Sequence, residues 1–337
     1  MIAVGVDTHK HRHIAVAVSE LGQLLGEIAV AASAAGYREL VTWLDGLDGE
    51  AMVGIEGAGS YGAGLCRHLQ TVGISAVEVE RPRRRDRRQG KSDRLDALLA
   101  AKRVLSGEGV STPRAGGNRS ALSVLLVAYR SCVEERTRLL NQLQGLHVTA
   151  PAVLRERIGH GNGAHLAGRL VRMRDRPDAS PDEGTMLIVL RDLARRARQL
   201  DDQAGRYRNE ITRLVREQNP GLLDEPGVGP ISAAKLLVCD PARFKSEAAF
   251  ARCNGTAPQP ASSGQTIRHR LSRSGDRQAN NAIHTIAMSR SINHAESRAY
   301  LERRISQGKT HREAMRSLKR HVSRRLYRRL IDTPLTP

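Results

Sequence analysis

Residues 2–30 read IAVGVDTHKHRHIAVAVSELGQLLGEIAV, and this stretch decides the fold of the first part of the chain. Residues 2–6 form a short apolar run, which is typical of a buried strand. Residues 13–19 and 23–30 are rich in small and branched apolar residues and flank a turn at 20–22, so they are expected to pair with each other. The stretch therefore predicts three antiparallel strands at the start of one sheet.

Helix-like and strand-like patterns then alternate along the chain. The helix-like stretches are residues 35–47, 61–71 and 93–105, and the strand-like stretches between them are residues 51–55 and 74–79. The resulting order is three strands, helix, strand, helix, strand, helix. Three antiparallel strands followed by a βαβα unit is the order of the RNase H-like fold, so we expect an α/β domain of that class at the N-terminus.

The chain of 337 residues is strongly basic, with 54 lysines and arginines against 35 acidic residues, a net charge of +19 and a pI near 10.8. A charge of this size repels itself unless a polyanion neutralises it, and nucleic acid is the usual polyanion. Aromatic residues make up only 3% of the chain, which argues against base stacking as the main mode of binding. The composition therefore predicts contacts to a nucleic-acid backbone.

The sequence carries no sign of secretion or of a membrane segment. Its four cysteines form no C-x-x-C pair, which argues against a zinc site and fits a reducing compartment. The N-terminus has neither the basic region nor the apolar run of a signal peptide, and no apolar run approaches the ~20 residues that cross a bilayer. We therefore expect a cytoplasmic protein without a membrane partner.

Four acidic residues occupy positions where they would meet in the expected fold. Asp7 ends the first strand and Glu56 ends the fourth, and these strand ends are neighbours in an RNase H-like sheet. Asp93 and Asp96 lie three residues apart near the start of the closing helix, so they share one face. Converging carboxylates repel one another, and Mg²⁺ would relieve this repulsion because hard oxygen ligands suit it. Two such ions ~4 Å apart can hold the attacking and leaving oxygens of a phosphodiester.

These residues also have interpretations that need no metal. Asp7 could cap a turn, and Asp93 with Asp96 could stabilise a helix N-terminus. Residues 57–62, GAGSYG, match the G-x-G-x-x-G fingerprint of dinucleotide-binding folds. That fingerprint normally opens its fold, whereas here it follows the fourth strand and no second mononucleotide half comes after it. A metal-dependent phosphodiester site is therefore the preferred interpretation.

Two stretches concentrate the positive charge. Residues 81–88 read RPRRRDRR and directly precede the acidic pair, where they would hold a phosphate backbone beside the metal. The candidate contacts there are Arg81, Arg83, Arg84, Arg85, Arg87, Arg88 and Lys91. Residues 302–330 contain eleven lysines or arginines, and one helix face there would present Arg316, Lys319 and Arg320 to nucleic acid. The alternatives are a solvated linker for the first stretch and a membrane-surface helix for the second, which lacks aromatic anchors.

The middle of the chain has the pattern of long helices. Residues 122–146 and 186–214 repeat apolar residues at alternating spacings of three and four, which is typical of coiled coils. They could pair within one chain or between subunits. Residues 151–185 between them are rich in glycine, arginine and proline and are expected to form a partly flexible insert.

The last part of the chain is expected to be mainly helical and to contain a helix-hairpin-helix element. Residues 223–237 read LDEPGVGPISAAKLL, in which Gly227 and Gly229 would form the hairpin and Lys235 would follow on the next helix. The backbone amides of such an element can hold a DNA phosphate without reading the base sequence. We therefore expect these three residues to contact nucleic acid.

A serine on a glycine-flanked loop follows this element. Residues 261–264 read ASSG, and the candidate nucleic-acid contacts downstream are Arg268, Arg270 and Arg273. A serine among arginines could attack a phosphate covalently, although Ser-Gly pairs are also common in ordinary turns. Ser263, directly before the glycine, is the preferred nucleophile, and Ser262 is the alternative.

Several motifs, taken in order, resemble the DEDD transposases of the insertion-sequence-110 family, which are bridge-RNA-guided recombinases. The matching stretches are Gly5-Val6-Asp7-Thr8-His9-Lys10, Glu56 with Gly59 and Tyr61, KSDRLDA at 91–97, Pro226-Gly227-Val228-Gly229, and Gly255, Pro258, Ser263-Gly264 and Gly275. They extend over nearly the whole chain. The KSDRLDA block and the late Ser-Gly pair are the most specific of them.

The resemblance implies a RuvC-like catalytic domain at residues 1–110 that binds Mg²⁺ through Asp7, Glu56, Asp93 and Asp96. It implies a C-terminal transposase domain at residues 217–332, in which Ser263 forms a phosphoserine link to DNA. Residues 115–216 would form the coiled-coil oligomerisation region of a homotetramer, including the insert at 151–185. The partners would be donor DNA, target DNA and a structured noncoding guide RNA, in the bacterial cytoplasm at the nucleoid.

Two other functions are compatible with the same residues. A RuvC-like junction resolvase would use metal-activated water instead of a serine, and the presence or absence of a covalent protein–DNA adduct distinguishes the two enzymes. A catalytically inactive nucleic-acid-binding protein would keep its full activity after Asp7→Ala.

Overall fold

The structure is a computed structural model of the chain, and it describes residues 1–80, 92–113, 116–261, 269–270, 272 and 275–331. It contains two compact units, Met1–Ala121 and Leu122–Pro337. Each unit buries its own apolar side chains in separate cores.

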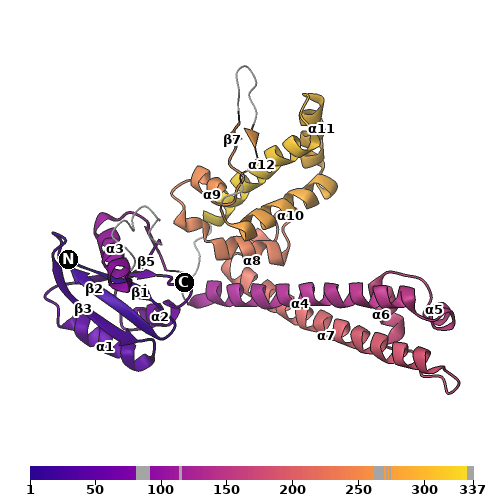
Figure 1. The fold of residues 1–337 in the computed structure, drawn as a ribbon. Coiled ribbons are helices and arrows are strands. Elements are labelled where there is room, and N and C mark those ends of the chain that lie inside the picture. Colours follow the sequence, from indigo (N-terminus) through magenta and orange to yellow (C-terminus); the bar gives the residue numbers. More distant parts are fainter. Residues whose placement is uncertain (81–91, 114–115, 262–268, 271, 273–274, 332–337) are drawn as a thin grey trace. The chain divides into compact units, whose positions relative to one another are not determined.

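A mixed six-stranded sheet forms the centre of the first unit (Figure 1). Its strands are β1 (Ile2–Thr8), β2 (Arg12–Val18), β3 (Leu24–Ala31), β4 (Ala51–Glu56), β5 (Ala76–Val79) and β6 (Val110–Ser111). Their order is β3-β2-β1-β4-β5-β6, with β1 to β3 antiparallel, β4 and β5 parallel to β1, and β6 antiparallel to β5. This arrangement is consistent with the expected RNase H-like fold. The sequence pattern missed only β6 among the described strands of this sheet, because two residues are too few to show a period.

Three helices cover the sheet: α1 (Ala34–Asp45), α2 (Ala63–Thr71) and α3 (Asp93–Ser106). Val4 and Val6 of β1 belong to the core that includes α1 and α2, whereas Ala3 belongs to the core beneath α3. Successive residues of a strand point to opposite faces, so this apolar run buries both sides of β1. β1 is therefore buried on both faces, and it also lies between β2 and β4 within the sheet.

Glycine and alanine let α3 approach β1 closely. A Cβ on Gly5 would overlap the carbonyl oxygen of Ala97 and the backbone nitrogen of Ala101. Both alanines are completely buried, as expected where a helix lies against a strand with no side chain between them. This packing carries the first turn of α3, with its two aspartates, to the end of β1.

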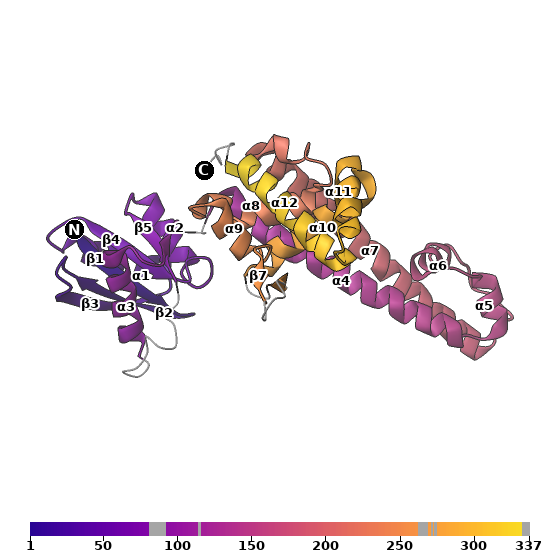
Figure 2. The same cartoon turned by 90° about the horizontal axis from the view of Figure 1, so that it is seen from above.

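The helices in the middle of the chain are α4 (Gly117–Thr149), α5 (Ala152–Ile158), α6 (Gly163–Leu170) and α7 (Pro181–Gln218). Within the second unit, α4 and α7 lie side by side in opposite directions (Figures 1 and 2). The guanidinium of Arg136 and the carboxylate of Asp201 are 2.6 Å apart, and Leu143 shares a core with Leu190. The two predicted long helices therefore contact each other within the chain. Coiled-coil geometry and pairing between subunits stay predictions.

Residues 151–185, which the sequence predicts to be a partly flexible insert, contain two short helices. Leu154 and Ile158 of α5 are completely buried in the core that α4 and α7 share. Gly159 follows α5 with φ +76°, and the side chain of Asn162 caps α6. Gly159 and Asn162 therefore mark helix ends, and apolar residues of α5 provide packing, while the partial flexibility of the insert stays a prediction.

The remaining elements are η2 (Pro220–Leu222), α8 (Pro230–Cys239), η3 (Pro241–Arg243), α9 (Glu247–Cys253), β7 (Gln259–Pro260), β8 (His269–Arg270), α10 (Arg277–Asn293), α11 (Ala295–Ser306) and α12 (His311–Ile331). Phe250 is completely buried at their centre and stacks on Tyr327 at 5.4 Å. The Tyr327 hydroxyl donates a 2.7 Å hydrogen bond to the carbonyl oxygen of Phe244. This part is mainly helical, as expected. Among the described residues, no helix combines the length and apolar character needed to cross a membrane.

Candidate metal centre and nucleic-acid contacts

The first unit places Asp7 and Glu56 at the same edge of the sheet. β1 and β4 run parallel with Val6 opposite Ile55, so the next residue on each strand is the acidic one. Thr8 Oγ1 donates a 2.7 Å hydrogen bond to the carbonyl oxygen of Glu56, which joins the two strand ends. Asp7 and Glu56 are each 7% exposed, a costly position for two ionised carboxylates without a compensating cation.

The first turn of α3 supplies the other two predicted carboxylates. The Ser92 hydroxyl caps the helix by accepting a 3.2 Å hydrogen bond from the backbone N–H of Leu95. Asp96 is buried, whereas the side chain of Asp93 is 36% exposed. Carboxylates in a first turn also suit the helix dipole, so this location alone does not require a metal.

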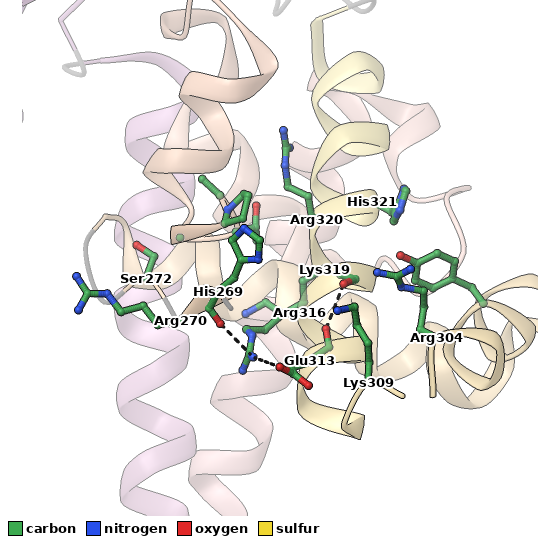
Figure 3. Close-up of a pocket in the computed structure, with 16 residues that line it drawn as sticks. His269, Arg270, Ser272, Arg304, Lys309, Glu313, Arg316, Lys319, Arg320 and His321 are labelled. Atoms are coloured by element: carbon green, nitrogen blue, oxygen red, sulfur yellow. Dashed lines mark hydrogen bonds and ion pairs between the residues drawn. The ribbon is translucent and has the colours of Figure 1, made fainter. Parts of the chain in front are cut away.

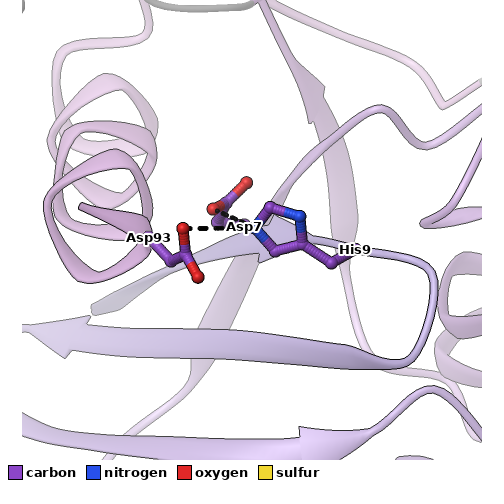
Figure 4. Close-up of side chains that lie close together, drawn as sticks. All are labelled: Asp7, His9 and Asp93. Atoms are coloured by element: carbon purple, nitrogen blue, oxygen red, sulfur yellow. Dashed lines mark hydrogen bonds and ion pairs between the residues drawn. The ribbon is translucent and has the colours of Figure 1, made fainter. Parts of the chain in front are cut away.

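Asp7, His9 and Asp93 meet in space at the end of β1 (Figure 4). Nε2 of His9 lies 3.1 Å from Asp7 Oδ2 and 3.4 Å from Asp93 Oδ1. One potential ligand atom from each of the three residues lies within 4.8 Å of the others. The guanidinium of Arg12 adds a positive charge 3.6 Å from Asp93 Oδ2. The carboxylates of this cluster therefore already contact a histidine and an arginine of the chain itself.

The charge balance of this cluster favours a bound cation. Burial raises the pKa of Asp7 above its ordinary value of 3.8, His9 lowers it, and the negative charges of Asp96 and Asp93 raise it again. A divalent ion would reverse the repulsion among these carboxylates. Carboxylate oxygens suit Mg²⁺ or Mn²⁺, whereas an imidazole nitrogen is a ligand more typical of Zn²⁺, Fe²⁺ or Ni²⁺. The residues present therefore fit a divalent metal ion.

The four predicted carboxylates do not all join the same close group. Among the described residues, the potential metal-binding group consists of Asp7, His9 and Asp93, while Asp96 acts on Asp7 through its charge. Glu56 lies at the adjacent strand end and is not part of that group. Sequence reasoning gave His9 no role. The available signal was its position two residues after Asp7, directly beyond the end of β1.

The glycines of residues 57–62 have packing roles in the structure. Gly57 has φ +71°, a conformation that lets the chain turn sharply after β4. A Cβ on Gly62 would lie 2.6 Å from Ile55 Cγ2, so a side chain there would collide with the end of β4. The glycine pattern therefore follows from a tight turn beside Glu56, which favours packing over dinucleotide binding.

The predicted hairpin of the second unit packs on α10. Gly227 has φ +75°, and a Cβ there would lie 3.1 Å from the carbonyl oxygen of Ile286. Gly229 is the N-cap of α8. Further along that helix, Lys235 Nζ donates a 2.7 Å hydrogen bond to Asn281 Oδ1, and burial lowers the pKa of this lysine. The helix-hairpin-helix assignment itself stays a prediction.

Arg270, Arg316, Lys319 and Arg320 line one cavity of the second unit. The first lies on β8 and the other three on α12. The guanidinium of Arg316 donates a 3.5 Å hydrogen bond to the carbonyl oxygen of His269, which connects α12 to β8. Lys319 is only 8% exposed, so this side of α12 differs from the open basic face that the sequence suggested.

Several predicted contacts lie outside the described residues: Arg81, Arg83, Arg84, Arg85, Arg87, Arg88, Lys91, Ser262, Ser263, Arg268 and Arg273. Their roles stay predictions from the sequence. The described strands β7 and β8 pair antiparallel, with Gln259 opposite Arg270 and Pro260 opposite His269. Both candidate serines belong to the segment that connects these two strands along the chain.

Comparison with known proteins identifies the same family at both ends of the chain. A family model of DEDD transposases of IS110 matches residues 4–149, and a model described as "Transposase IS116/IS110/IS902 family" matches residues 221–302. The first range includes all four predicted carboxylates, and the second includes both candidate serines. The uncharacterized 43.6 kDa protein of insertion element IS110 from Streptomyces coelicolor is 30% identical over 254 residues. That match covers 63% of this chain and 63% of the relative, which is less than two thirds of its length. The chain belongs to the IS110 family of transposases.

Proposed function

We propose that this chain is a transposase that cuts and rejoins DNA by phosphodiester transesterification. The observation that carries the proposal is the acidic cluster at the end of β1, found in a chain of this family. Family membership supports DNA as the substrate class. A net charge of +19 suits a polyanionic substrate, because released counterions favour binding of basic proteins to DNA.

The metal in this proposal is Mg²⁺, held by Asp7, Glu56, Asp93 and Asp96. When bound, it would polarise the scissile phosphate and offset the negative charge that develops there. Asp7 and Asp93 already offer oxygens to one small volume, and the charge of Asp96 reaches Asp7. His9 stands between two of these carboxylates and would orient them or add a nitrogen ligand.

Ser263 supplies the nucleophile in this proposal. Its Oγ forms a bond to phosphorus as it loses its proton, and the phosphorus–oxygen bond to one strand end breaks. The departing strand end takes up a proton and becomes a hydroxyl. The hydroxyl of a new strand end then reverses the step, so the phosphoester is conserved and no nucleoside triphosphate is consumed. Arginines of the C-terminal part would stabilise the charge on the phosphate.

The nucleic-acid partners in this proposal are donor DNA, target DNA and a structured noncoding guide RNA. The sequence resemblance supports the RNA, and the basic residues 81–91 support contacts to the backbone. The turn before α8, acting as a helix-hairpin-helix element, would hold phosphates without reading the base sequence. Base pairing to the RNA would then select the target, at the nucleoid of a bacterial cell.

The long helices α4 and α7 would join subunits into a homotetramer. Val124 and Val127 on α4 are 67% and 58% exposed, and Ile188 on α7 is 56% exposed. Apolar side chains exposed along long helices are suited to a protein partner. Residues 115–216 are therefore the proposed oligomerisation region, between a catalytic domain at 1–110 and a transposase domain at 217–332.

Ser263→Ala tests the nucleophile, and Ser262→Ala is its matched control. The protein is co-purified with RNA from the flanks of its element and incubated with donor DNA, target DNA and Mg²⁺. We expect the wild type and Ser262→Ala to give recombinant junctions and a denaturation-resistant protein–DNA adduct, and Ser263→Ala to give neither. An adduct at wild-type level in Ser263→Ala would remove this residue from the role of nucleophile.

A RuvC-like junction resolvase is the second candidate function. The acidic cluster favours it as well, because carboxylates that hold a metal can activate a water molecule without any serine. The resolvase would cleave branched DNA without forming an adduct and without added RNA. It would also keep its full activity in Ser263→Ala, which separates it from the transposase.

A further inference from the structure

A cavity of about 380 Å³ is lined by residues 255–258, strand β8 and the helices α11 and α12 (Figure 3). This volume is within the range of small-molecule sites. The end of the β7–β8 ribbon is fixed on one side, where Gln259 Nε2 donates a 3.1 Å hydrogen bond to Ser272 Oγ. On the other side, Arg316 connects α12 to the backbone of β8. The walls of the cavity therefore include β8 and α12, which are joined by a direct hydrogen bond.

The lining of this cavity is strongly cationic. Its charged basic side chains are Arg270, Arg304, Lys309, Arg316, Lys319 and Arg320, and its acidic side chain is Glu313. Glu313 accepts hydrogen bonds from the backbone N–H and the hydroxyl of Thr310 at 3.0 and 2.8 Å, and it lies 3.9 Å from the guanidinium of Arg316. Arg320 has its own partner in Glu247, outside the lining. A large excess of positive charge therefore remains around the cavity.

Lys319 is the least expected member of this lining, because its side chain is buried and has no acidic partner among the residues that the structure describes. Among the described residues, its hydrogen-bond partner is neutral: Nζ donates a 3.2 Å hydrogen bond to Asn280 Oδ1. Asn280 is itself oriented, since its Nδ2 donates to the carbonyl oxygen of Asn254 at 2.6 Å. Burial lowers the pKa of Lys319. An ammonium group held this way is stabilised when an anion enters beside it.

We infer that this cavity binds a single phosphate group of the DNA backbone, with Lys319 and Arg316 as its principal donors. An ammonium offers three N–H donors and a guanidinium offers five, which match the oxygens of a phosphate. The inference rests on the proposed function for the choice of DNA as the source of the phosphate. This anion site differs from exposed basic residues because it depends on one buried lysine, Lys319.

The test compares Lys319→Met with Lys245→Met in the full-length protein. Both changes remove one positive charge from the same unit, but Lys245 is exposed and lies outside the cavity lining. Binding of inorganic phosphate is measured by calorimetry. We expect Lys319→Met to weaken it about tenfold or more, as the loss of a charged hydrogen bond predicts, and Lys245→Met to change it less than about twofold. Equal phosphate binding by Lys319→Met and the wild type would overturn the site.

A second variant and a second ligand make the outcome decisive. Arg316→Gln removes the other donor from a less buried position, so it reports on the cavity if Lys319→Met fails to fold. A short single-stranded DNA should displace the bound phosphate, whereas the same DNA with an uncharged methylphosphonate backbone should not. Displacement by neither DNA would assign the cavity to free phosphate and overturn the DNA assignment. A protein that passes these tests but forms no covalent adduct would contradict the proposed function alone.

Discussion

The acidic cluster of the first unit and the basic cavity of the second bury charge of opposite sign. At the end of β1, two aspartates approach each other with a histidine between them, and a third aspartate lies near enough to affect the first. In the cavity beside α12, a buried lysine donates a hydrogen bond to the amide oxygen of Asn280. Both arrangements reduce the free energy of unfolding, because burying a charge is costly unless it is compensated. Each therefore indicates a ligand of the opposite sign.

The two sites differ in how the chain itself responds to that cost. The imidazole of His9 and the guanidinium of Arg12 lie beside carboxylates of the acidic cluster, so side chains of the protein occupy part of the space around them. Lys319 has no such substitute among the described residues. At the acidic site, we therefore expect a metal ion to replace contacts between the carboxylates and other side chains of the protein. At the basic site, we expect the positive charge of Lys319 to be compensated mainly by the bound phosphate.

Among the changes that test this difference between the two sites, replacing Asp7 is expected to have the largest effect. Asp7→Asn should lower DNA rejoining at least about 100-fold, because even residues that only support metal ligands contribute 10–100-fold. Without Mg²⁺ the same change should raise the melting temperature, because it removes a buried carboxylate whose ionisation is disfavoured. Activity and calorimetric melting with and without Mg²⁺ measure both effects.

Asp48→Asn is the matched control for Asp7→Asn, since it removes an exposed carboxylate from the same unit. It should leave both activity and melting temperature close to those of the wild type. If Mg²⁺ raised the melting temperature of Asp7→Asn as much as that of the wild type, Asp7 would not be a metal ligand.

A change at Gly5 tests whether the acidic site depends on close packing of α3. Gly5→Ala should reduce the free energy of unfolding by about 1–3 kcal/mol or more, because even one methyl group meets the backbone of that helix. Gly26→Ala in the same sheet should increase it by about 0.5–1 kcal/mol, because its Cβ would only touch Trp43 at an ordinary 3.6 Å. Urea denaturation measures both, and equal effects would contradict the packing argument.

The smallest expected effect is a pH dependence at the basic site. Burial lowers the pKa of Lys319 in the folded chain below its ordinary value of 10.5. Between these two values the unfolded chain holds more protons, so the free energy of unfolding should rise with pH across that window. Lys319→Met should remove this rise. The measurement is denaturation of both proteins from about pH 7 to about pH 10, and parallel curves would show that Lys319 does not contribute.

Much of the first unit could be predicted from the sequence because its signals are local. The apolar runs of residues 2–6 and 51–55 match β1 and β4, and acidic residues follow both of them. Parallel neighbours end at the same sheet edge, so the proximity of Asp7 and Glu56 followed from the strand order. The tight approach at Gly5 was not predicted, since it depends on which residues of α3 lie opposite the glycine.

The sequence by itself determined the order of strands and helices, the excess of positive charge and the positions of the acidic residues along the chain. Periodicity and composition are properties of neighbouring residues, so no distant contact is needed to see them. Only the tertiary structure decided that His9 stands between Asp7 and Asp93, and that Lys319 is buried beside Asn280. Both results depend on contacts between side chains of separate elements that are far apart in the sequence. A pattern of neighbouring residues contains no information on such contacts.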